Sequence, residues 1–245
     1  MGEFESSHAV HGLNMAATVV DSVAVGAADN IATLETGSLT VSGSNRVLWV
    51  HVGSGAGTPV DPTSVKWGGS GGTSLTQIST TLDVGSNEKI SVWRLISPAA
   101  TSSTVYVTWP SAQDERWIIA VAVQDADQTT PNGTVATATG TSNTPSVAAT
   151  STSGQLVLDF VSFLDTGSDT LTVGAGQTQL ENIAGGAFSS FEGSASSTET
   201  ASGSSTTMSW TISDVSVNGW GIFAFAINDA SGGGGPAGNI AWIRA

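Results

Sequence analysis

The sequence contains no cysteine among its 245 residues. This absence excludes disulfide bridges, thiolate metal sites and cysteine nucleophiles, and a chain of this length is able to bury a core without cross-links. Basic residues are scarce too, because Lys and Arg number 6 against 20 Asp and Glu, which gives a net charge of −14. Nucleic acids and anionic membranes bind clustered cations, so the composition argues against both as partners and favours solubility.

The chain also lacks a long apolar run and a basic leader. No stretch approaches the ~20 apolar residues that a helix needs to span a bilayer. The first residues, MGEFESSHAVHGLN, carry acids where a secretory signal peptide carries basic residues. Charged residues are only 11% of the chain, and Gly, Ser, Thr and Ala take their place. This composition suits strands and short turns better than surface helices, so we expect an all-β protein.

Alternation of apolar and polar residues predicts the strands themselves. In STVYVTW, the apolar residues Val105, Val107 and Trp109 fall on one face, and the polar residues between them fall on the other. Further strands are expected at Arg46–Val52, Lys89–Ile96, Trp117–Gln124, Gln155–Phe163 and Trp220–Asn228. Several of these runs are apolar on both faces, which predicts central strands that are covered on both sides.

Two blocks of the first half resemble two blocks of the second half in the same order. Ser38–Val52 matches Ser146–Val161 with one extra residue in the turn, and Ser103–Ala126 matches Thr206–Asp229 at a constant offset of 103 residues. At that offset, the matched pairs are Val105 with Met208, Val107 with Trp210, Trp109 with Ile212 and Trp117 with Trp220. Internal duplication explains the shared order. The alternative is that Ser/Thr-rich β-sequences resemble one another through composition alone.

Each half alone has too few strands to cover its apolar face, so we expect an antiparallel, jelly-roll-like sandwich in which the halves face each other. Two tandem small sandwiches are the alternative. The expected parts are an extended arm at 1–15, the sandwich at 16–231 with halves at 38–127 and 146–229, a Gly-rich hinge at 232–237 and a terminal strand at 238–245. Gln124–Gly133 would connect the two halves.

Several stretches together resemble a β-rich module of tailed-bacteriophage virion proteins that also occurs in some bacterial surface proteins. They are SVWRLISPAATSSTVYVTW, DQTTPNGTVATATGTSNTPSVAATSTSGQLVLDFVSF, GAGQTQ and TTMSWTIS, and the resemblance covers roughly Ser38 to Asn228. These motifs are turn and core signatures. The resemblance implies a structural or attachment role on a particle, and no catalytic residue comes with it.

Candidate nucleophiles and bases are weakly placed. GGSGG, with Ser70 at its centre, fits the G-x-S-x-G pattern of an esterase elbow, but that elbow needs a following helix and a later His. All three histidines, His8, His11 and His51, precede Ser70. The pair His8 and His11 is expected in an exposed arm, and His51 is expected to be a sheet histidine with a hydrogen-bonded ring.

The acids offer two further hypotheses. Asp125 and Asp127, with Asn228 and Asp229 at the matched place, are weak candidate ligands for Ca²⁺, although Asx residues also cap turns without metal. Glycoside hydrolysis needs two carboxyl groups on one cleft, and candidates such as Asp159 and Glu192 cannot be paired from the sequence. Glu115 is expected in a hairpin turn. We therefore expect no cofactor and no enzyme.

The 8 tryptophans and the chain end bear on partners. Most of the tryptophans lie in apolar strands and are expected in the core, and Trp67, beside the glycine loop, is the best candidate for an exposed ring that contacts a glycan. The final apolar residues Ile240, Trp242 and Ile243 follow the glycine hinge. They are expected to bury themselves either on their own body or on a neighbouring subunit.

Together these observations favour a non-enzymatic virion protein at the surface of an extracellular particle. It would decorate the capsid of a tailed phage as an oligomer, in contact with other virion proteins and with copies of itself. The alternatives are a tail or fibre component and a cell-surface carbohydrate-binding module.

Overall fold

A computed structural model describes residues 15–55, 57–164, 169–184, 192–214 and 216–230. All regular structure in these ranges is β-strand, and every ladder between named strands is antiparallel. Within them we find no helix with the length and apolarity that crossing a bilayer requires. The predicted all-β class is therefore confirmed.

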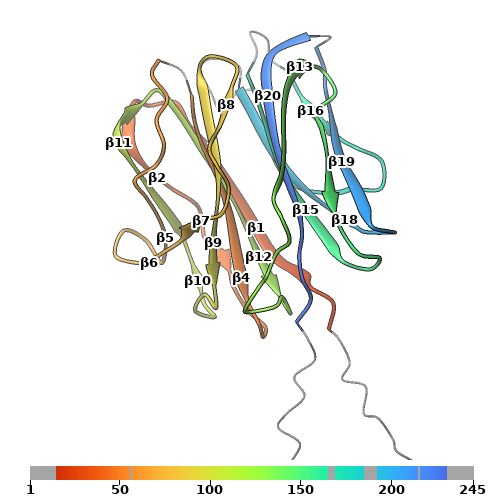
Figure 1. Ribbon diagram of the computed structural model, residues 1–245. Helices are drawn as coiled ribbons and strands as arrows, with labels where there is room; N and C mark the ends of the chain where they lie inside the picture. The colour runs from red at the N-terminus through yellow and green to blue at the C-terminus, as the bar shows by residue number, and fades with distance from the viewer. Residues whose placement is uncertain (1–14, 56, 165–168, 185–191, 215, 231–245) are drawn as a thin grey trace, which may run out of the picture.

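The first unit, β1 to β12, contains two larger sheets (Figure 1). Its inner sheet runs in the order β1–β12–β4–β9–β7, with β8 also paired to β9: β1 (Thr18–Ala27), β12 (Glu115–Gln124), β4 (Val47–Gly55), β9 (Glu88–Ile96), β7 (Thr76–Gln77) and β8 (Leu82–Val84). Its outer sheet runs in the order β2 (Ile31–Glu35), β11 (Val105–Gln113), β5 (Ser64–Trp67) and β6 (Thr73–Ser74). A small ladder joins β3 (Leu39–Thr40) to β10 (Ser102–Ser103).

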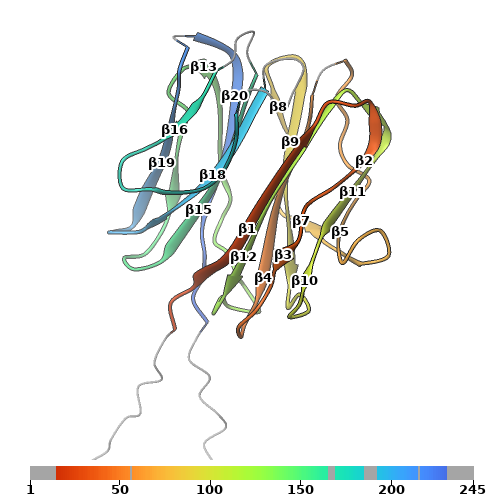
Figure 2. The same ribbon diagram turned by 180° about the vertical axis from the view of Figure 1, so that it is seen from behind.

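The second unit, β13 to β20, has the same two-sheet construction (Figure 2). Its inner sheet runs in the order β13 (Ala136–Ser142), β20 (Ser216–Ala226), β15 (Leu156–Leu164), β18 (Glu192–Thr200) and β17 (Thr178–Ala184). Its outer sheet runs in the order β14 (Ser146–Thr150), β19 (Ser205–Ile212) and β16 (Leu171–Val173). The predicted connection Gln124–Gly133 lies between β12 and β13 and so links the units.

Each unit has its own apolar core between its inner and outer sheets. In the first unit, Val105, Val107 and Trp109 of β11 pack against alternate residues of β4 and β12, as the alternation predicted. In the second unit, Met208 and Trp210 of β19 pack in the same way against β15 and β20. Because the side chains of a strand point alternately to its two faces, the remaining residues of the inner strands face the other way.

Those remaining residues form a third core, the central interface, in which the two inner sheets pack on each other. Trp49 of β4 and Phe225 of β20 meet there with ring centroids 5.7 Å apart. The interface also holds Ile119 of β12 and Phe160 of β15. The inner strands are therefore covered on both sides, which confirms the prediction from their two-sided apolar pattern.

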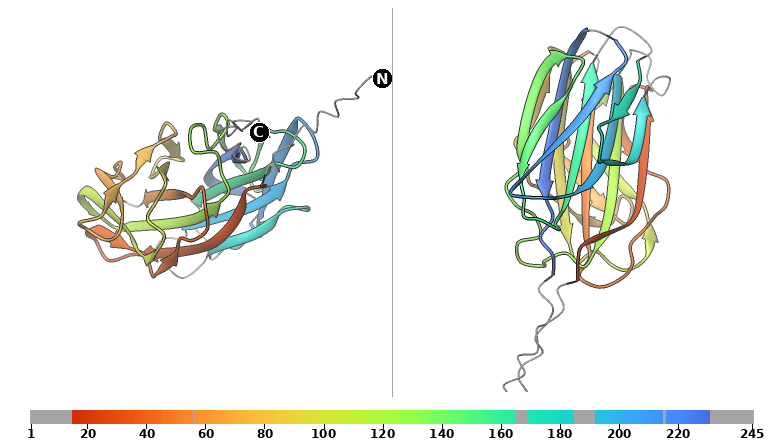
Figure 3. Two further views of the ribbon diagram at one scale, coloured as in Figure 1. Left: turned by 90° about the horizontal axis from the view of Figure 1, so that it is seen from below. Right: turned by 90° about the vertical axis from the view of Figure 1, so that its right-hand side faces the viewer.

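The expected arrangement of one sheet from each half is wrong. Each half supplies two sheets, and the two units stack face to face into four sheet layers, as the view from below shows (Figure 3). The match of Trp117 with Trp220 is also displaced, because Trp117 lies in the central interface and Trp220 lies in the core of the second unit. The ladders contain irregularities within β11, between Thr108 and Gln113, and within β20, between Ser216 and Trp220, so one constant offset does not hold along both strands of this hairpin.

The edge strands of the two inner sheets meet at one side of the central interface. Ser22 of β1 donates a hydrogen bond from its hydroxyl to the Glu181 carboxylate of β17, at 2.6 Å. Both strands carry an irregularity beside this contact, between Val19 and Asp21 and between Gln179 and Glu181. Bulges and acids on edge strands disfavour further strand pairing, so this seam is closed to added strands.

The first and last described residues lie together at one end of the molecule, which we call the lower end (Figure 1). Met15 forms an antiparallel bridge with Ala230, and the Ala17 amide donates to the Asp229 carboxylate at 2.8 Å. Met15, expected in the arm, is thus paired. The rest of the expected arm, the hinge 232–237 and the strand 238–245 lie outside the described residues.

Gly53 provides a test of the packing in the central interface. A Cβ atom at Gly53 of β4 would overlap the indole ring of Trp117 on the neighbouring strand. Gly53→Ala is expected to lower the free energy of unfolding by about 1–3 kcal/mol, the range for overpacked cores. Urea unfolding measures this. Gly71→Ala, whose Cβ would meet no atom within 4 Å, is the matched control, and equal losses for both variants would contradict the packing.

Candidate functional site

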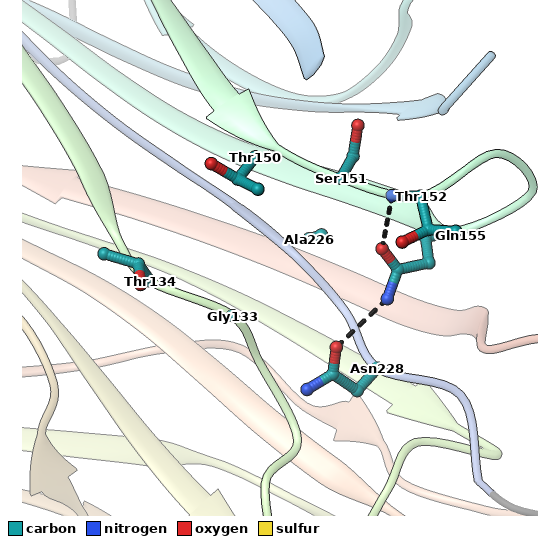
Figure 4. A pocket seen from close by; sticks show the side chains of 8 residues that line it. All are labelled: Gly133, Thr134, Thr150, Ser151, Thr152, Gln155, Ala226 and Asn228. Carbon is teal, nitrogen blue, oxygen red and sulfur yellow. Dashed lines mark hydrogen bonds between the residues drawn. The ribbon is translucent and has the colours of Figure 1, made fainter. Parts of the chain in front are cut away.

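A polar groove of about 320 Å³ opens at the lower end, between the end of β14 and the end of β20 (Figure 4). Neutral polar side chains dominate its lining: the hydroxyls of Thr134, Thr150, Ser151 and Thr152 and the amides of Gln155 and Asn228. None of the described residues that line the groove has an ionisable side chain. Its lining therefore supplies no general acid or base.

The two amides of this groove are held in place by the surrounding loops. Gln155 accepts a hydrogen bond from the Thr152 amide at 2.7 Å and donates to the Asn228 side chain at 3.0 Å (Figure 4). Asn228 in turn donates to the Thr130 carbonyl of the connection between the units, at 2.5 Å. These bonds attach the end of β20 to the segment that connects the two units, so the groove lies where the units are joined.

An apolar groove of about 470 Å³ lies close by, where the start of β1 passes the second unit. Ala16, Ala17 and Val19 line one side and Leu156 and Leu180 line the other, and four threonines complete the lining with Gly154: Thr18, Thr178, Thr198 and Thr200. Ala16 and Ala17 directly follow Met15, so this groove lies beside the point where both ends of the described chain meet.

His51, Ser162 and Ser194 form a hydrogen-bonded chain inside the central interface. The Nε2 atom of His51 lies 2.8 Å from the Ser162 hydroxyl, which donates to the Ser194 hydroxyl at 3.0 Å, and Ser194 donates to the Val161 carbonyl. Because the single Ser162 proton is used, Nε2 of His51 is the donor. The His51 ring stacks on Phe160 with centroids 5.4 Å apart. The predicted hydrogen-bonded sheet histidine is confirmed.

The contact between Ser162 and His51 has the length of a nucleophile–base pair, but its surroundings exclude that role. Both side chains have an exposed fraction of 0%, and burial lowers the pKa of His51 to about 3. A base of that pKa is too weak to take a serine proton at neutral pH, and a buried hydroxyl does not reach a substrate. The chain of hydrogen bonds instead satisfies polar groups across the interface.

Ser70 does not lie in an esterase elbow. It stands in the loop between β5 and β6, and its carbonyl accepts a hydrogen bond from Lys66 at 2.8 Å. The residues that follow form β6 and β7, where an elbow requires a helix. His8 and His11 lie outside the described residues.

Asp159 is a buried carboxyl group in the core of the second unit. One oxygen accepts hydrogen bonds from the amide and hydroxyl of Ser197, and the other accepts from the Trp210 indole, all at 2.7 Å. Burial raises its pKa to about 7, although these donors act in the opposite direction. The group therefore positions Trp210. The side chain of Glu192, the other candidate acid, lies outside the described side chains.

Glu88 and Glu115 form a pair of buried acids that the sequence did not indicate. Both are opposite Gly55 of β4, on the strands that flank it, and therefore share the face of the central interface. Their exposed fractions are 1% and 0%, so their oxygens do not meet a substrate. Burial, and next the charge of Glu115, raise the pKa of Glu88 well above its usual value. Glu115, expected in a turn, is the first residue of β12.

The structure brings the calcium candidates together through the bridge between Ala126 and Asp229, but their carboxylates bond to separate partners. Asp127 caps a turn by accepting the amides of Thr129 and Thr130 at 2.7 Å each, and these bonds lower its pKa. Asp125 lies at a positive φ of 59° and its side chain contacts the Ser44 hydroxyl at 3.3 Å. Among the described residues, no three His, Asp or Glu side chains gather in a metal-binding group.

Trp67 is not the exposed ring that the sequence suggested. Its side chain is 3% exposed and packs in the core of the first unit, because β5 alternates and Val65 and Trp67 share its inward face. A sugar has no access to it. The alternation of SVKW carried this signal, since the polar residues Ser64 and Lys66 occupy the outward positions.

Ser162 provides a test of the buried hydrogen-bonded chain. Ser162→Ala leaves the N–H of His51 without its acceptor, which is expected to lower the free energy of unfolding by about 1–3 kcal/mol. Ser196, on the neighbouring β18, is also fully buried, but its hydroxyl has no hydrogen-bond partner. Ser196→Ala is therefore expected to be neutral or stabilising. Urea unfolding at pH 7 compares the two variants, and the reverse order would refute the chain.

Glu88 provides a test through pH. A raised pKa means that the folded state keeps a proton which the unfolded chain releases above about pH 4.5. The free energy of unfolding therefore falls as the pH rises toward the folded-state pKa. Glu88→Gln keeps the shape without ionising, so its stability advantage over wild type is expected to grow from pH 5 to pH 8. Ser196→Ala, which removes no titratable group, is the control, and a constant difference for Glu88→Gln would contradict the assignment.

The described residues therefore offer two grooves at the lower end and a set of buried polar groups that hold strands and rings in place. No protein-family model and no curated protein matches the chain.

Proposed function

We propose that this chain is a non-enzymatic structural protein of a tailed-phage particle, most specifically a protein that decorates the outer capsid. The resemblance of its turn and core motifs to virion modules supports this, as does a net charge of −14, which keeps a surface protein soluble. Its partners would be other virion proteins and copies of itself. A tail or fibre component is the close variant of the same proposal.

The observation that carries the proposal is the pairing of Met15 with Ala230. This bridge brings the two ends of the body to one place, so residues 1–14 and 231–245 both start from the lower end. A body connected to its surroundings at one end projects its other surfaces away from that end. Such an arrangement fits a protein that coats a particle.

The C-terminal residues Ile240, Trp242 and Ile243 are the proposed contacts to a neighbouring subunit. The apolar groove beside Ala16 and Leu156 is the corresponding receiving surface, because it adjoins the place from which these segments start. Burial of the three side chains would contribute several kcal/mol at about 25 cal/mol per Å², before the cost of ordering the segment.

We further infer that the body arose by internal duplication into two jelly-roll-like units. The inner sheets have corresponding orders, β1–β12–β4–β9 and β13–β20–β15–β18, and the outer sheets correspond as β2–β11–β5 and β14–β19–β16. On this basis Ile119 corresponds to Phe223, since each faces the central interface and lies in register with β4 or β15. In these orders β2 takes the place of β14. Because β2 precedes Ser38, it lies outside the block that the sequence comparison matched to the β14 region.

The test is to purify tailed particles from the source of the chain on a density gradient and to detect the chain by mass spectrometry. It is expected to sediment with intact particles. Replacing Ile240, Trp242 and Ile243 together by serine is expected to reduce its incorporation at least about tenfold, since an apolar contact is lost.

The matched control for that experiment is Ile31→Ser. Ile31 is an exposed isoleucine, 49% accessible, at the start of β2, which follows the end of β1 farthest from Met15 and Ala230. This variant is expected to incorporate normally. A chain that stays in the soluble fraction, or a triple variant that incorporates as well as wild type, would overturn the proposal.

A further inference from the structure

A row of three dissimilar side chains crosses the outer sheet of the first unit. Tyr106 of β11 lies directly between Glu35 of β2 and Lys66 of β5 in the register of the sheet. Their neighbours Val105 and Val107 are fully buried, so alternation turns Tyr106 outward, where it is half-buried. Tyr106 is the only tyrosine of the chain.

The two charged groups flank the ring without neutralising each other. No ion pair joins Glu35 to Lys66. Neighbouring strands lie about 4.8 Å apart, so the two charged residues start about 10 Å apart across the ring. The sheet therefore presents an acceptor, an aromatic surface and a donor in a line.

Both charged side chains are positioned by further contacts. The Glu35 carboxylate accepts a hydrogen bond from the Thr104 hydroxyl at 2.5 Å, and the Lys66 ammonium donates to the Ser70 carbonyl at 2.8 Å. Positioned groups lose less conformational entropy when a ligand binds. Each keeps further hydrogen-bonding capacity, because a carboxylate has two oxygens and an ammonium has three protons.

The glycine loop Gly68–Gly72 borders this row. Gly68 and Gly69 have φ values of +98° and +76°, a conformation that glycine adopts readily. A Cβ atom at Gly69 would lie 3.5 Å from the Glu35 carboxylate, so the loop adjoins that end of the row. Four of the five loop positions are glycine, so Ser70 is the single loop position with a side chain, and Glu35 itself is exposed.

We propose that Glu35, Tyr106 and Lys66 form a binding site for a neutral polysaccharide. Sugar rings combine apolar C–H faces, which pack on an aromatic ring, with hydroxyl groups that both accept and donate hydrogen bonds. Glu35 accepts from these hydroxyls and Lys66 donates to them. An anionic ligand would meet the Glu35 carboxylate and a net charge of −14, and an apolar peptide would meet two charges around one ring.

The outer sheet of the second unit provides an internal comparison. On its middle strand β19, Thr207 pairs with Ala148 of β14. These two residues present a hydroxyl and a methyl group where the first unit presents the aromatic ring of Tyr106. The proposed site is thus confined to the first unit. It goes beyond the structural role proposed above, because attachment at the lower end does not require it.

The experiment measures binding of the full chain to cellohexaose, maltohexaose, mannohexaose and N-acetylchitohexaose by saturation-transfer NMR and calorimetry. At least one of these is expected to bind with a dissociation constant in the millimolar range or tighter. Tyr106→Ala is expected to weaken that binding about tenfold or more, and Tyr106→Phe is expected to retain it because the ring remains. Glu35→Gln and Lys66→Met are expected to weaken it severalfold.

Thr207→Ala, on the other outer sheet, is the matched control and is expected to bind like wild type. Thermal unfolding of each variant checks that the fold is retained, which is expected because these side chains lie at the surface. Absence of binding to all four oligosaccharides, or equal binding by wild type and Tyr106→Ala, would overturn the site. Either result leaves the incorporation of the chain into particles unaffected, so this site and the structural role fail independently.

Discussion

The packing of the two inner sheets on each other is the interaction on which the rest of the structure depends. Trp49 and Phe225 meet at its centre, and the four inner strands β4, β12, β15 and β20 have apolar residues on both faces because of it. If the units were separate, these apolar faces would be exposed to water, at a free-energy cost of about 25 cal/mol for each Å² of apolar surface. The interface therefore joins two sandwiches into one body, and it brings the start of β1 and the end of β20 to the same end.

The layered packing also removes several ionisable groups from contact with solvent. His51, Glu88 and Glu115 lie in the central interface, and Asp159 lies in the core of the second unit beside Trp210. Perturbed pKa values often mark catalytic sites, but His51, Glu88 and Asp159 lack access to a substrate, and burial is the main cause of each of their shifts. Exposed surfaces supply the functional candidates instead, namely the grooves at the lower end and the row across β2, β11 and β5.

The sequence predicted the strands well and their layering poorly. Alternation located β4, β9, β11, β12, β15 and β20 to within a few residues, since period-two patterns report directly which residues share a face. Alternation could not predict which faces pack on each other, because the pattern of an apolar face does not specify its partner. Strands that are apolar on both faces are equally consistent with one thick sandwich and with two stacked sandwiches. The central interface shows that the protein has two stacked sandwiches.

The sequence was equally limited in predicting the contacts of single residues. Trp67 was the best candidate among the tryptophans for an exposed ring because a glycine loop follows it, yet the aromatic residue that faces outward near that loop is the half-buried Tyr106, which alternation had already placed on the outer face. The acids Glu88 and Glu115 are 27 positions apart, and only the pairing of both strands with Gly55 brings them to one face. Local patterns predict which face of a strand a side chain lies on. Contacts between residues of different strands depend instead on the order of strands in the sheet.

The central claim is that the chain coats a particle and is attached through its lower end. Cryo-electron microscopy of purified tailed particles that carry the chain tests this most directly. The account predicts regular copies of a four-layered body, each with the end that holds Met15 and Ala230 toward the particle. Copies attached through an outer sheet with that end facing solvent, or particles that carry no copy, would contradict it.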